Sequence, residues 1–363
     1  MTMAHTRDSF LSHAIWRRTR CYSRATIPAA FTLLALTSAF YGLAPTRADQ
    51  AVPMLSTHLS CTHTVNGQLL LPVRLTGAKG QKVDANFILD TGVNKCSITD
   101  AMADRLGLKS EAGVGDDGRP MVFNGFVARL VHVPLLELGA IPCGPVPCVV
   151  LGAKALAATT GQAVDGILGN NLLTALPALI NLQSKEVTFF GPGPITADTL
   201  RSVGMADATT IPLDDLDNND TYACMVRIES GGKSLRKDLV LDIGSGETMI
   251  NGSDARKLGL STQGKPTSSF TLLSGSTKMY EGKATLIALG NEVPSSNAAA
   301  QVRDVTVAYP KGDLPNFLPP HLGRDVLGRY LLLMDFAEKK MYVKPISVSN
   351  APAFVPKIII GGK

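Results

Sequence analysis

The feature that most constrains the fold is an internal repeat. The stretch "FILDTGVNKCSIT" (87–99) is matched by "LVLDIGSGETMING" (239–252): each has an apolar run, an acid, and a glycine two residues later. "ADRLGL" ends 18 residues after Asp90, and "ARKLGL" ends 18 residues after Asp242. Matches that recur in the same order at matched spacing indicate a duplicated structural unit.

The repeat extends over most of the chain. "LLELG" and "LIALG" end 49 and 48 residues after their acids, and "GILGNNLLTALPALINLQSKEVTFF" aligns with "PHLGRDVLGRYLLLMDFAEKKMYVK". The alignment makes Gly169 equivalent to Gly323, and each lies 12 residues before an equivalent polar residue, Asn181 or Asp335. The sequence therefore predicts two copies, roughly 60–200 and 210–345. The segment "GPGPITADTLRSVG", rich in glycine, proline and serine, is predicted to link them.

Strand patterns dominate both copies. "KVDANFIL" alternates apolar and polar residues before the first acid, and "FVARLVHVPLLEL" is rich in β-branched residues and leucine. "SITDAMADRLGL" and "GSDARKLGL" predict one short helix per copy, each ending at a glycine that can adopt the left-handed cap. We expect a mainly β, bilobal protein whose two lobes are related by a pseudo-two-fold axis.

The N-terminal segment has the layout of a secretory signal peptide. Four arginines between residues 17 and 24 precede an apolar stretch from about Ile27 to Ala44, and "TRA" offers a cleavage site at Ala48. The alternative is an uncleaved membrane anchor, because the apolar stretch is nearly long enough to span a bilayer. The expected organisation is a signal segment at 1–48, lobes at 49–200 and 205–345, and a tail at 346–363. Export to the periplasm or the medium is predicted.

Charge and cysteine content narrow the function classes. The chain has 35 basic and 30 acidic residues, but residues 1–48 hold six of the former and one of the latter. Residues 49–363 hold 29 basic and 29 acidic residues and carry no net charge. The excess of basic residues therefore gives no support to nucleic-acid binding by this part of the chain. "CGPVPC", with Cys143 and Cys148, could close a disulfide in an oxidising compartment. No histidine or further cysteine lies near enough to suggest zinc, so no metal or cofactor is expected.

Two equivalent acids can carry hydrolytic chemistry. Carboxylates brought close across a pseudo-two-fold axis cannot both ionise comfortably, so Asp90 and Asp242 would share a proton. The ionised member can act as a base on a water molecule, and the protonated member can donate to a substrate carbonyl oxygen. Gly92 and Gly244 would let the two loops approach closely. The alternative is that Asp90 is only a turn residue.

These residues resemble the aspartic peptidases of the pepsin and retropepsin group. The resemblance rests on "ILDTG", on "ILG" (167–169) and on the repetition of both elements, and it covers most of residues 60–345. "LGRDVLGRYLLLMDFAEKKMYVKP" is similar to the closing segment of pepsin-type chains, and "VDGILGNNLL" to bacterial retropepsin-like proteins. The resemblance implies a bilobal acid-protease fold and a monomeric, exported bacterial enzyme that cleaves peptides or proteins in the inter-lobe cleft. It makes Asp90 and Asp242 the catalytic dyad.

The loop residues depart from the family's pattern. The resemblance implies that Thr91 supports one loop, but Ile243 stands where the family has the second threonine, so half of the expected cross-brace is missing. After the loop glycine, the family has a small hydroxyl residue that supports the outer carboxylate oxygen. Ser245 keeps it and Val93 does not. A lost hydrogen bond of this kind is worth about 0.5–1.5 kcal/mol.

The flap that would cover the cleft is also atypical, because no tyrosine lies between Asp90 and Gly139. The best flap candidate is the glycine-rich segment 111–120, with Gly113, Val114 and Gly115. Two functions remain open: an exported aspartic endopeptidase, or a weak or inactive homologue that binds peptides in the cleft.

Four other residues are expected to have structural rather than catalytic roles. Asp165 is expected to accept backbone hydrogen bonds in a loop, Asn181 and Asp335 to hold turns, and Cys96 to be a small buried side chain rather than a redox switch.

Overall fold

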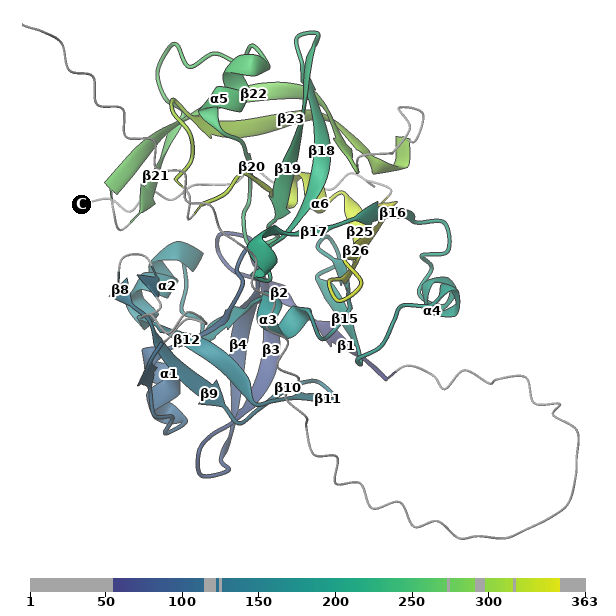
Figure 1. Cartoon of the computed structure of the whole chain (residues 1–363). Coiled ribbons are helices and arrows are strands. Elements are labelled where there is room, and N and C mark those ends of the chain that lie inside the picture. Colours follow the sequence, from purple (N-terminus) through teal and green to yellow (C-terminus); the bar gives the residue numbers. More distant parts are fainter. Residues whose placement is uncertain are drawn as a thin grey trace, which may run out of the picture. The chain divides into compact units, whose positions relative to one another are not determined.

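Each half of the chain forms its own sheet. In each sheet, one strand is followed directly by one of the two acids, Asp90 or Asp242. The computed structural model describes residues 55–113, 122–123, 126–272, 275–290, 298–315 and 318–346. Both halves fall within one unit, Val52–Lys363. In Figure 1 the purple and blue strands of the first half and the green strands of the second half belong to separate sheets.

The sheet of the first half has the strand order β11-β10-β3-β4-β13-β5-β12-β9-β6, and β2 pairs with β3. Its strands are β2 (Thr62–His63), β3 (Leu69–Thr76), β4 (Lys82–Leu89), β5 (Cys96–Thr99), β6 (Glu111–Ala112), β9 (Arg129–Val133), β10 (Leu135–Leu138), β11 (Ile141–Cys143), β12 (Val146–Leu151) and β13 (Gly166–Leu168). A separate hairpin joins β7 (Val122–Phe123) to β8 (Phe126–Val127).

The sheet of the second half has the order β17-β18-β19-β24-β20-β23-β22-β21. Its strands are β17 (Asp214–Asp215), β18 (Tyr222–Ser230), β19 (Lys233–Leu241), β20 (Thr248–Met249), β21 (Ser268–Leu272), β22 (Gly275–Leu289), β23 (Gln301–Pro310) and β24 (His321–Leu322).

The predicted duplication is confirmed in the topology. In the first half, β13 runs parallel to β4 and antiparallel to β5, and β12 runs parallel to β5. In the second half, β24 runs parallel to β19 and antiparallel to β20, and β23 runs parallel to β20. Each acid therefore leaves an equivalent central strand at an equivalent place.

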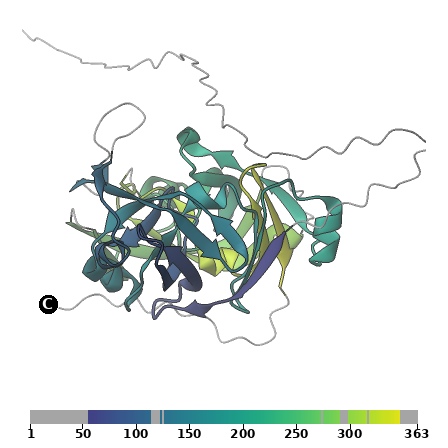
Figure 2. The ribbon, with the colours of Figure 1, turned by 90° about the horizontal axis from the view of Figure 1, so that it is seen from below.

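A third sheet joins the two halves. Its order is β1 (Ser56–Ser60), β15 (Glu186–Phe190), β14 (Ala178–Asn181), β25 (Tyr330–Asp335), β26 (Lys340–Pro345) and β16 (Thr209–Pro212). Strands from the two ends of the described chain thus lie in one layer, as the two views show (Figures 1 and 2). One apolar cluster continues from this sheet into both lobes, which holds the lobes together.

The helices are short. The two expected helices are α1 (Asp100–Arg105) and α5 (Gly252–Lys257), and the chain after each passes through a left-handed glycine, Gly107 or Gly259. The predicted link contains α4. The other helices of the described chain are α2 (Ala153–Thr160), α3 (Asn170–Leu173), α4 (Ala197–Ser202), α6 (Arg324–Leu327) and the 3₁₀ turns η1 (Leu216–Asn218) and η2 (Ala298–Ala300).

Three polar residues have the structural roles that were predicted. The Asp165 carboxylate accepts a hydrogen bond from the Asn86 backbone N–H at 2.8 Å. Asn181 Oδ1 accepts backbone N–H groups of the β14–β15 turn, and Asp335 Oδ1 accepts one in the β25–β26 turn. The β14–β15 turn and the β25–β26 turn are therefore equivalent in structure as well as in sequence.

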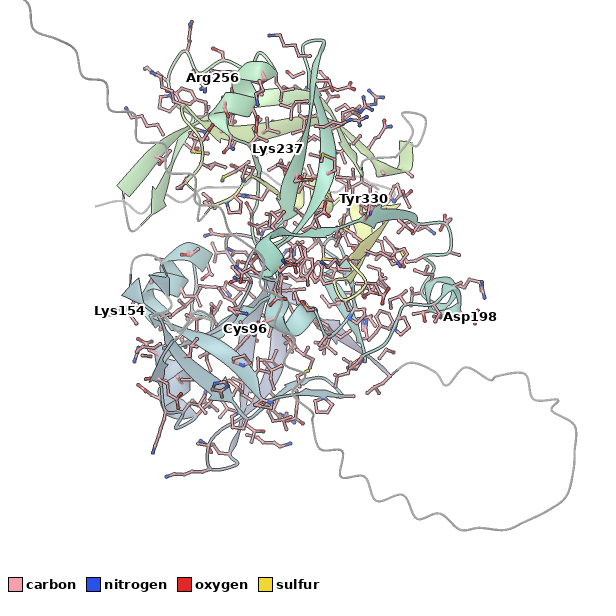
Figure 3. The ribbon with its side chains drawn as sticks, viewed as in Figure 1. Cys96, Lys154, Asp198, Lys237, Arg256 and Tyr330 are labelled. Atoms are coloured by element: carbon pink, nitrogen blue, oxygen red, sulfur yellow. The ribbon has the colours of Figure 1, made fainter. Side chains whose placement is uncertain are left out.

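The cysteines differ from the expected disulfide. All five cysteines of the described chain are free and buried, including Cys143 and Cys148. These two lie on β11 and β12, which are not hydrogen-bonded neighbours in the sheet, and Cys148 instead lies in register beside Cys96 of β5. Cys96 is fully buried in the core of the first lobe, where Figure 3 labels it. It is a small core side chain, as expected.

Several sequence predictions fall outside the described residues: the signal segment 1–48, flap residues Val114 and Gly115, and all but the first residue of the tail 346–363. Across the part of the chain that the structure describes, no helix has the length and apolar character needed to cross a membrane.

Candidate active site

The two acids are anchored in the same way. The backbone N–H of Asp90 donates to the Leu168 carbonyl at 3.1 Å, and that of Asp242 donates to the Leu322 carbonyl at 3.0 Å. In each lobe the partner carbonyl belongs to the strand parallel to the one that the acid follows. The sheets therefore fix both backbones, and both side chains are only half-buried.

The loop glycines bring the two acids together. A Cβ atom added to Gly92 would lie 2.5 Å from Asp242 Cγ, and one added to Gly244 would lie 2.4 Å from Asp90 Cγ. Each carboxyl group therefore occupies the space beside the other loop's glycine, where a side chain would collide with it. This confirms the close approach that the repeat predicted.

Burial and the neighbouring acid together perturb the protonation of Asp90. Desolvation and then the negative charge of Asp242 raise the pKa of Asp90 to about 8, against the opposing effects of the Gly92 N–H and the Arg324 guanidinium. A carboxyl group with this pKa keeps its proton at neutral pH, so the pair can hold one proton. The pair then offers one group that can donate a proton and one that can accept it.

The threonine brace is present on one side. Thr91 Oγ1 donates to the Leu241 carbonyl at 2.8 Å and accepts the Ile243 backbone N–H at 3.1 Å. Ile243 returns no such bond and is fully buried in the core. Half of the expected brace is therefore intact, and an apolar contact replaces the other half.

Two residues that the sequence analysis did not single out also support the loops. Arg324 donates to the carbonyls of Ile243 and Gly244 at 2.9 and 2.6 Å, and across the lobes to the Asn66 carbonyl at 2.9 Å. Its counterpart Asn170 donates to the Thr91 carbonyl at 2.9 Å.

Asn170 also crosses between the lobes, to the Asp220 carbonyl at 2.8 Å. Both residues directly follow the equivalent glycines of the repeat, Gly169 and Gly323. Comparing the two copies at that position could have found them.

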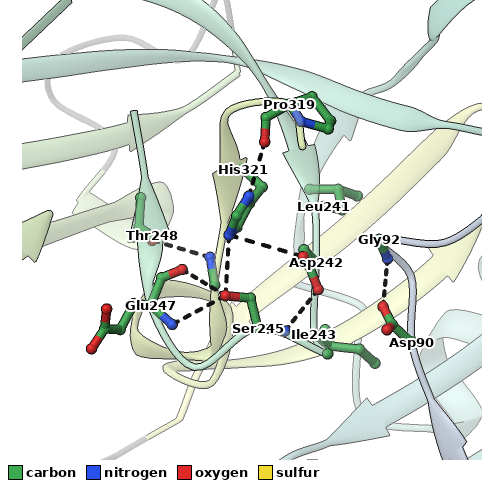
Figure 4. A network of polar contacts seen from close by, with 12 residues as sticks. Asp90, Gly92, Leu241, Asp242, Ile243, Ser245, Glu247, Thr248, Pro319 and His321 are labelled. Atoms are coloured by element: carbon green, nitrogen blue, oxygen red, sulfur yellow. Dashed lines mark hydrogen bonds and ion pairs between the residues drawn. The ribbon is translucent and has the colours of Figure 1, made fainter. Parts of the chain in front are cut away.

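Ser245 supports Asp242 differently from the expectation. Its backbone N–H, rather than its hydroxyl, donates to Asp242 Oδ1 at 2.7 Å. The hydroxyl lies 2.9 Å from the Glu247 carbonyl and 3.1 Å from His321 Nε2. That nitrogen is 3.9 Å from Asp242 Oδ2, so a histidine occupies the space beside the carboxylate (Figure 4). The sequence analysis missed His321, which lies two residues before Gly323.

The flap candidate is only partly described. Gly113 follows β6, and its N–H donates to the Ala128 carbonyl at 2.7 Å, which ties this end of the segment to the sheet. Val114 and Gly115 lie outside the described residues. Among the residues that the structure describes, no group of three or more histidine, cysteine or acidic side chains is placed to hold a metal ion.

Comparisons with known proteins agree with this geometry. A family model described as aspartyl protease matches residues 71–172 and, a second time, residues 225–326. The two matches cover more than half of the chain, and each contains one of the two acids. The chain belongs to the aspartyl protease family.

Solved structures with a similar arrangement include the crystal structures of basic 7S globulin from soybean and of conglutin gamma, a basic 7S globulin from lupine seeds. Each is 12% identical to this chain with a TM-score of 0.48, and the match covers 80% of this chain and 95% of the other. A search of curated proteins found no match.

Proposed function

We propose that the protein is an aspartic endopeptidase that hydrolyses peptide bonds with a water molecule activated between Asp90 and Asp242. The substrate is a peptide or an unfolded protein segment bound between the lobes, and the enzyme acts as a monomer without metal or cofactor. The signal-like segment 1–48 supports an exported, periplasmic or secreted enzyme. Membership of the aspartyl protease family supports the general class of reaction.

The single observation that carries the proposal is the reciprocal contact of each acid with the opposing loop's glycine. A structural turn aspartate would satisfy itself within its own loop. Here each carboxyl group receives one backbone N–H from its own loop, Asp90 from Gly92 and Asp242 from Ser245. The other lone pairs of the two carboxyl groups are directed into the space between the loops, where one water molecule could bind to both groups.

The reaction follows from a pair that holds one proton. The ionised carboxylate takes a proton from water as the water oxygen bonds to the peptide carbonyl carbon. The protonated carboxyl group gives its proton to the carbonyl oxygen, which yields a neutral tetrahedral diol. The proton taken from water then passes to the amide nitrogen, the C–N bond breaks, and one diol hydroxyl returns its proton to the pair. The pair ends with one proton, as it began.

A second candidate function is peptide binding by a weak or inactive homologue. It is favoured by the second loop, where Ile243 provides no hydroxyl and the Ser245 hydroxyl does not contact Asp242 in the way the family's pattern implies. The first loss leaves the loop of Asp90 without a hydroxyl from the second loop, and the second leaves Asp242 without the Ser245 hydroxyl, but neither removes an acid.

The deciding experiment incubates the purified protein with an unfolded protein substrate from pH 3 to 8, with and without pepstatin. Pepstatin-sensitive cleavage that disappears in the Asp242→Asn variant is the expected result. Peptide binding without any cleavage across this range would favour the second candidate.

A further inference from the structure

His321 sits beside only one of the two acids. It is buried, at 2% exposure, on β24, in register with Val240, two residues before Asp242. The equivalent residue of the first half is Ile167, in register with Ile88, two residues before Asp90. One member of the dyad therefore has an imidazole behind it, and the other has an aliphatic side chain.

The hydrogen bonds around His321 indicate the protonation of its ring. Nδ1 lies 2.9 Å from the Pro319 carbonyl oxygen, which can only accept, so Nδ1 carries a hydrogen. Nε2 lies 3.1 Å from Ser245 Oγ, and the single hydroxyl proton of Ser245 is directed to the Glu247 carbonyl at 2.9 Å. If the Ser245 proton stays directed to the Glu247 carbonyl, Nε2 is the donor to Ser245 Oγ. A ring that donates from both nitrogens is an imidazolium cation.

The charges around the ring favour a cation there. The Asp242 carboxylate, after β19, lies 3.9 Å from the ring, and the charge of His321 also acts on two other carboxyl groups, Glu247 before β20 and Asp325 of α6. Desolvation raises the pKa of both Glu247 and Asp325, and Glu281 of β22 adds to the effect on Glu247. Of the three carboxyl groups, Asp242 is the one whose oxygen lies 3.9 Å from the ring nitrogen.

The guanidinium of Arg324 is a second cation near the acids. It donates to the backbone carbonyls of Ile243, Gly244 and Asn66, and its charge acts on both Asp242 and Asp90, whereas the imidazole lies beside Asp242. Asp242 Oδ2 faces the ring nitrogen at 3.9 Å.

We propose that His321 is a positioning residue that pairs as an imidazolium with the Asp242 carboxylate and so leaves the proton of the dyad on Asp90. The inference rests on the proposed function. It assigns Asp242 as the base that takes the proton from water and Asp90 as the acid that donates to the substrate carbonyl. The strongly raised pKa of Asp90 agrees with this assignment.

A stability cycle tests the pairing without any activity. We would measure the melting temperatures at pH 6 of His321→Gln, Asp242→Asn and the double variant. If the imidazolium and the carboxylate interact, removing the second partner should cost much less once the first is gone, so the effects should be clearly non-additive. The cycle of His321→Gln with Asp90→Asn should show a smaller coupling. Additive effects for His321→Gln with Asp242→Asn would overturn the proposal.

A ring titration covers the case in which His321→Gln does not fold. The histidine ring NMR resonances of the wild type and of Asp242→Asn are followed against pH. Loss of a carboxylate within contact distance should move the His321 midpoint down by about one pH unit or more. An unmoved midpoint would contradict the pairing, whatever the enzyme's activity.

The pH profile of kcat/KM tests the catalytic consequence. Without the cation, Asp242 is protonated more easily, so the acidic limb of His321→Gln should shift upward by about one pH unit. His58→Gln is the matched control, because His58 Nε2 also lies near a carboxylate, 3.8 Å from Glu186, but on β1 of the shared sheet. That variant should reproduce the wild-type profile. An unshifted His321→Gln profile would overturn the assignment of the base, whereas a wild type without cleavage would instead refute the proposed function.

Discussion

The loops at Asp90–Val93 and Asp242–Ser245 occupy equivalent places but are held by different chemistry. The first loop supplies a threonine hydroxyl that bonds to the backbone of the second, at Leu241 and Ile243. The second loop returns no hydroxyl to the first, and the guanidinium of Arg324 holds its backbone in addition to Thr91, whereas the amide of Asn170 holds the first loop. Two copies of one unit can therefore keep the same backbone while their supporting side chains diverge.

The difference extends to the surroundings of the acids. Each acid accepts one backbone N–H from its own loop, but the pKa of Asp90 is strongly raised by desolvation, whereas Asp242 has His321 near its other oxygen. An unequal pair suits a reaction that needs one acid and one base, because the proton has a preferred position before the substrate binds. Equal environments would leave that position undetermined.

The largest expected effect comes from removing either acid. Asp90→Asn and Asp242→Asn should each lower kcat by at least about 1,000-fold, and the double variant should cost little more, because the two groups act as a unit. Initial rates on a fluorogenic peptide, with circular dichroism to confirm folding, would check this. Residual cleavage in only one of the variants would show that the two loops are not catalytically equivalent partners.

The loop glycines provide the next test. Gly92→Ala and Gly244→Ala should each reduce kcat/KM by roughly 100-fold, because the added Cβ would collide with the opposing carboxyl group and displace it. Gly152→Ala is the control, since a Cβ at Gly152 meets nothing within 4 Å and the residue does not adopt a left-handed conformation. Wild-type rates in either loop variant would mean that the loops can separate at no cost.

The residues that follow the repeat glycines should differ in their effect on stability. Arg324→Met removes a cation that donates to three carbonyls, and we expect a loss of about 2–4 kcal/mol in the free energy of unfolding. Asn170→Leu removes two such bonds and should cost about 1–3 kcal/mol.

Urea denaturation would measure both changes. Arg256→Met is the control, because this exposed arginine of α5, labelled in Figure 3, donates to a single carbonyl and should cost little. A larger loss in Asn170→Leu than in Arg324→Met would reverse the proposed difference between the loops.

The sequence predicted the fold and the close approach of the two acids because both depend on patterns that repeat along the chain. Apolar strands, acids and glycines at matched spacing locate Asp90 and Asp242 without any knowledge of contacts. The supports of the second loop could not be predicted in this way. Arg324 and His321 act through atoms of residues about 80 positions away, and their counterparts Asn170 and Ile167 have different chemistry.

The expectation of a disulfide between Cys143 and Cys148 was wrong for a similar reason. "CGPVPC" places two cysteines close in sequence, but the chain between them turns from β11 into β12, and β12 pairs with β5 and β9 instead. Local spacing reports nothing about which strands become neighbours across a sheet. The neighbours of the cysteines therefore depend on strand pairing between distant parts of the chain. The contact of the Ser245 hydroxyl with His321 depends on such pairing as well.

Stability against pH should separate Asp90 from an ordinary acid. Because the folded-state pKa of Asp90 is raised from 3.8 to about 8, its contribution to stability is full below about pH 4 and is lost as the pH rises through about 8. Asp90→Asn, which cannot ionise, should match the wild type near pH 4 and melt several degrees higher at pH 8.

The control for this test is Asp84→Asn. Asp84 is exposed and its bond to Arg74 lowers its pKa, so this variant should gain nothing at high pH. Scanning calorimetry from pH 4 to 8 gives both curves. If Asp90→Asn melts lower than the wild type at every pH, Asp90 is a turn residue whose hydrogen bonds stabilise the loop.

The smallest effect is expected from restoring the missing hydroxyl. Ile243→Thr removes the buried Cδ methyl group, at a cost of about 1 kcal/mol, and replaces the Cγ1 methylene group by a hydroxyl. That hydroxyl could regain about 0.5–1.5 kcal/mol by bonding to the Leu89 carbonyl, the counterpart of Leu241. The net change in unfolding free energy should be within about 1 kcal/mol of zero. Ile243→Val isolates the hydroxyl, because valine and threonine have nearly the same shape. If Ile243→Thr is the more stable of the two, the second half of the brace can still form, and the loops differ only by that substitution. If Ile243→Thr is the less stable, the hydroxyl is buried without a partner, and the second loop has been repacked around isoleucine with Arg324 as its support.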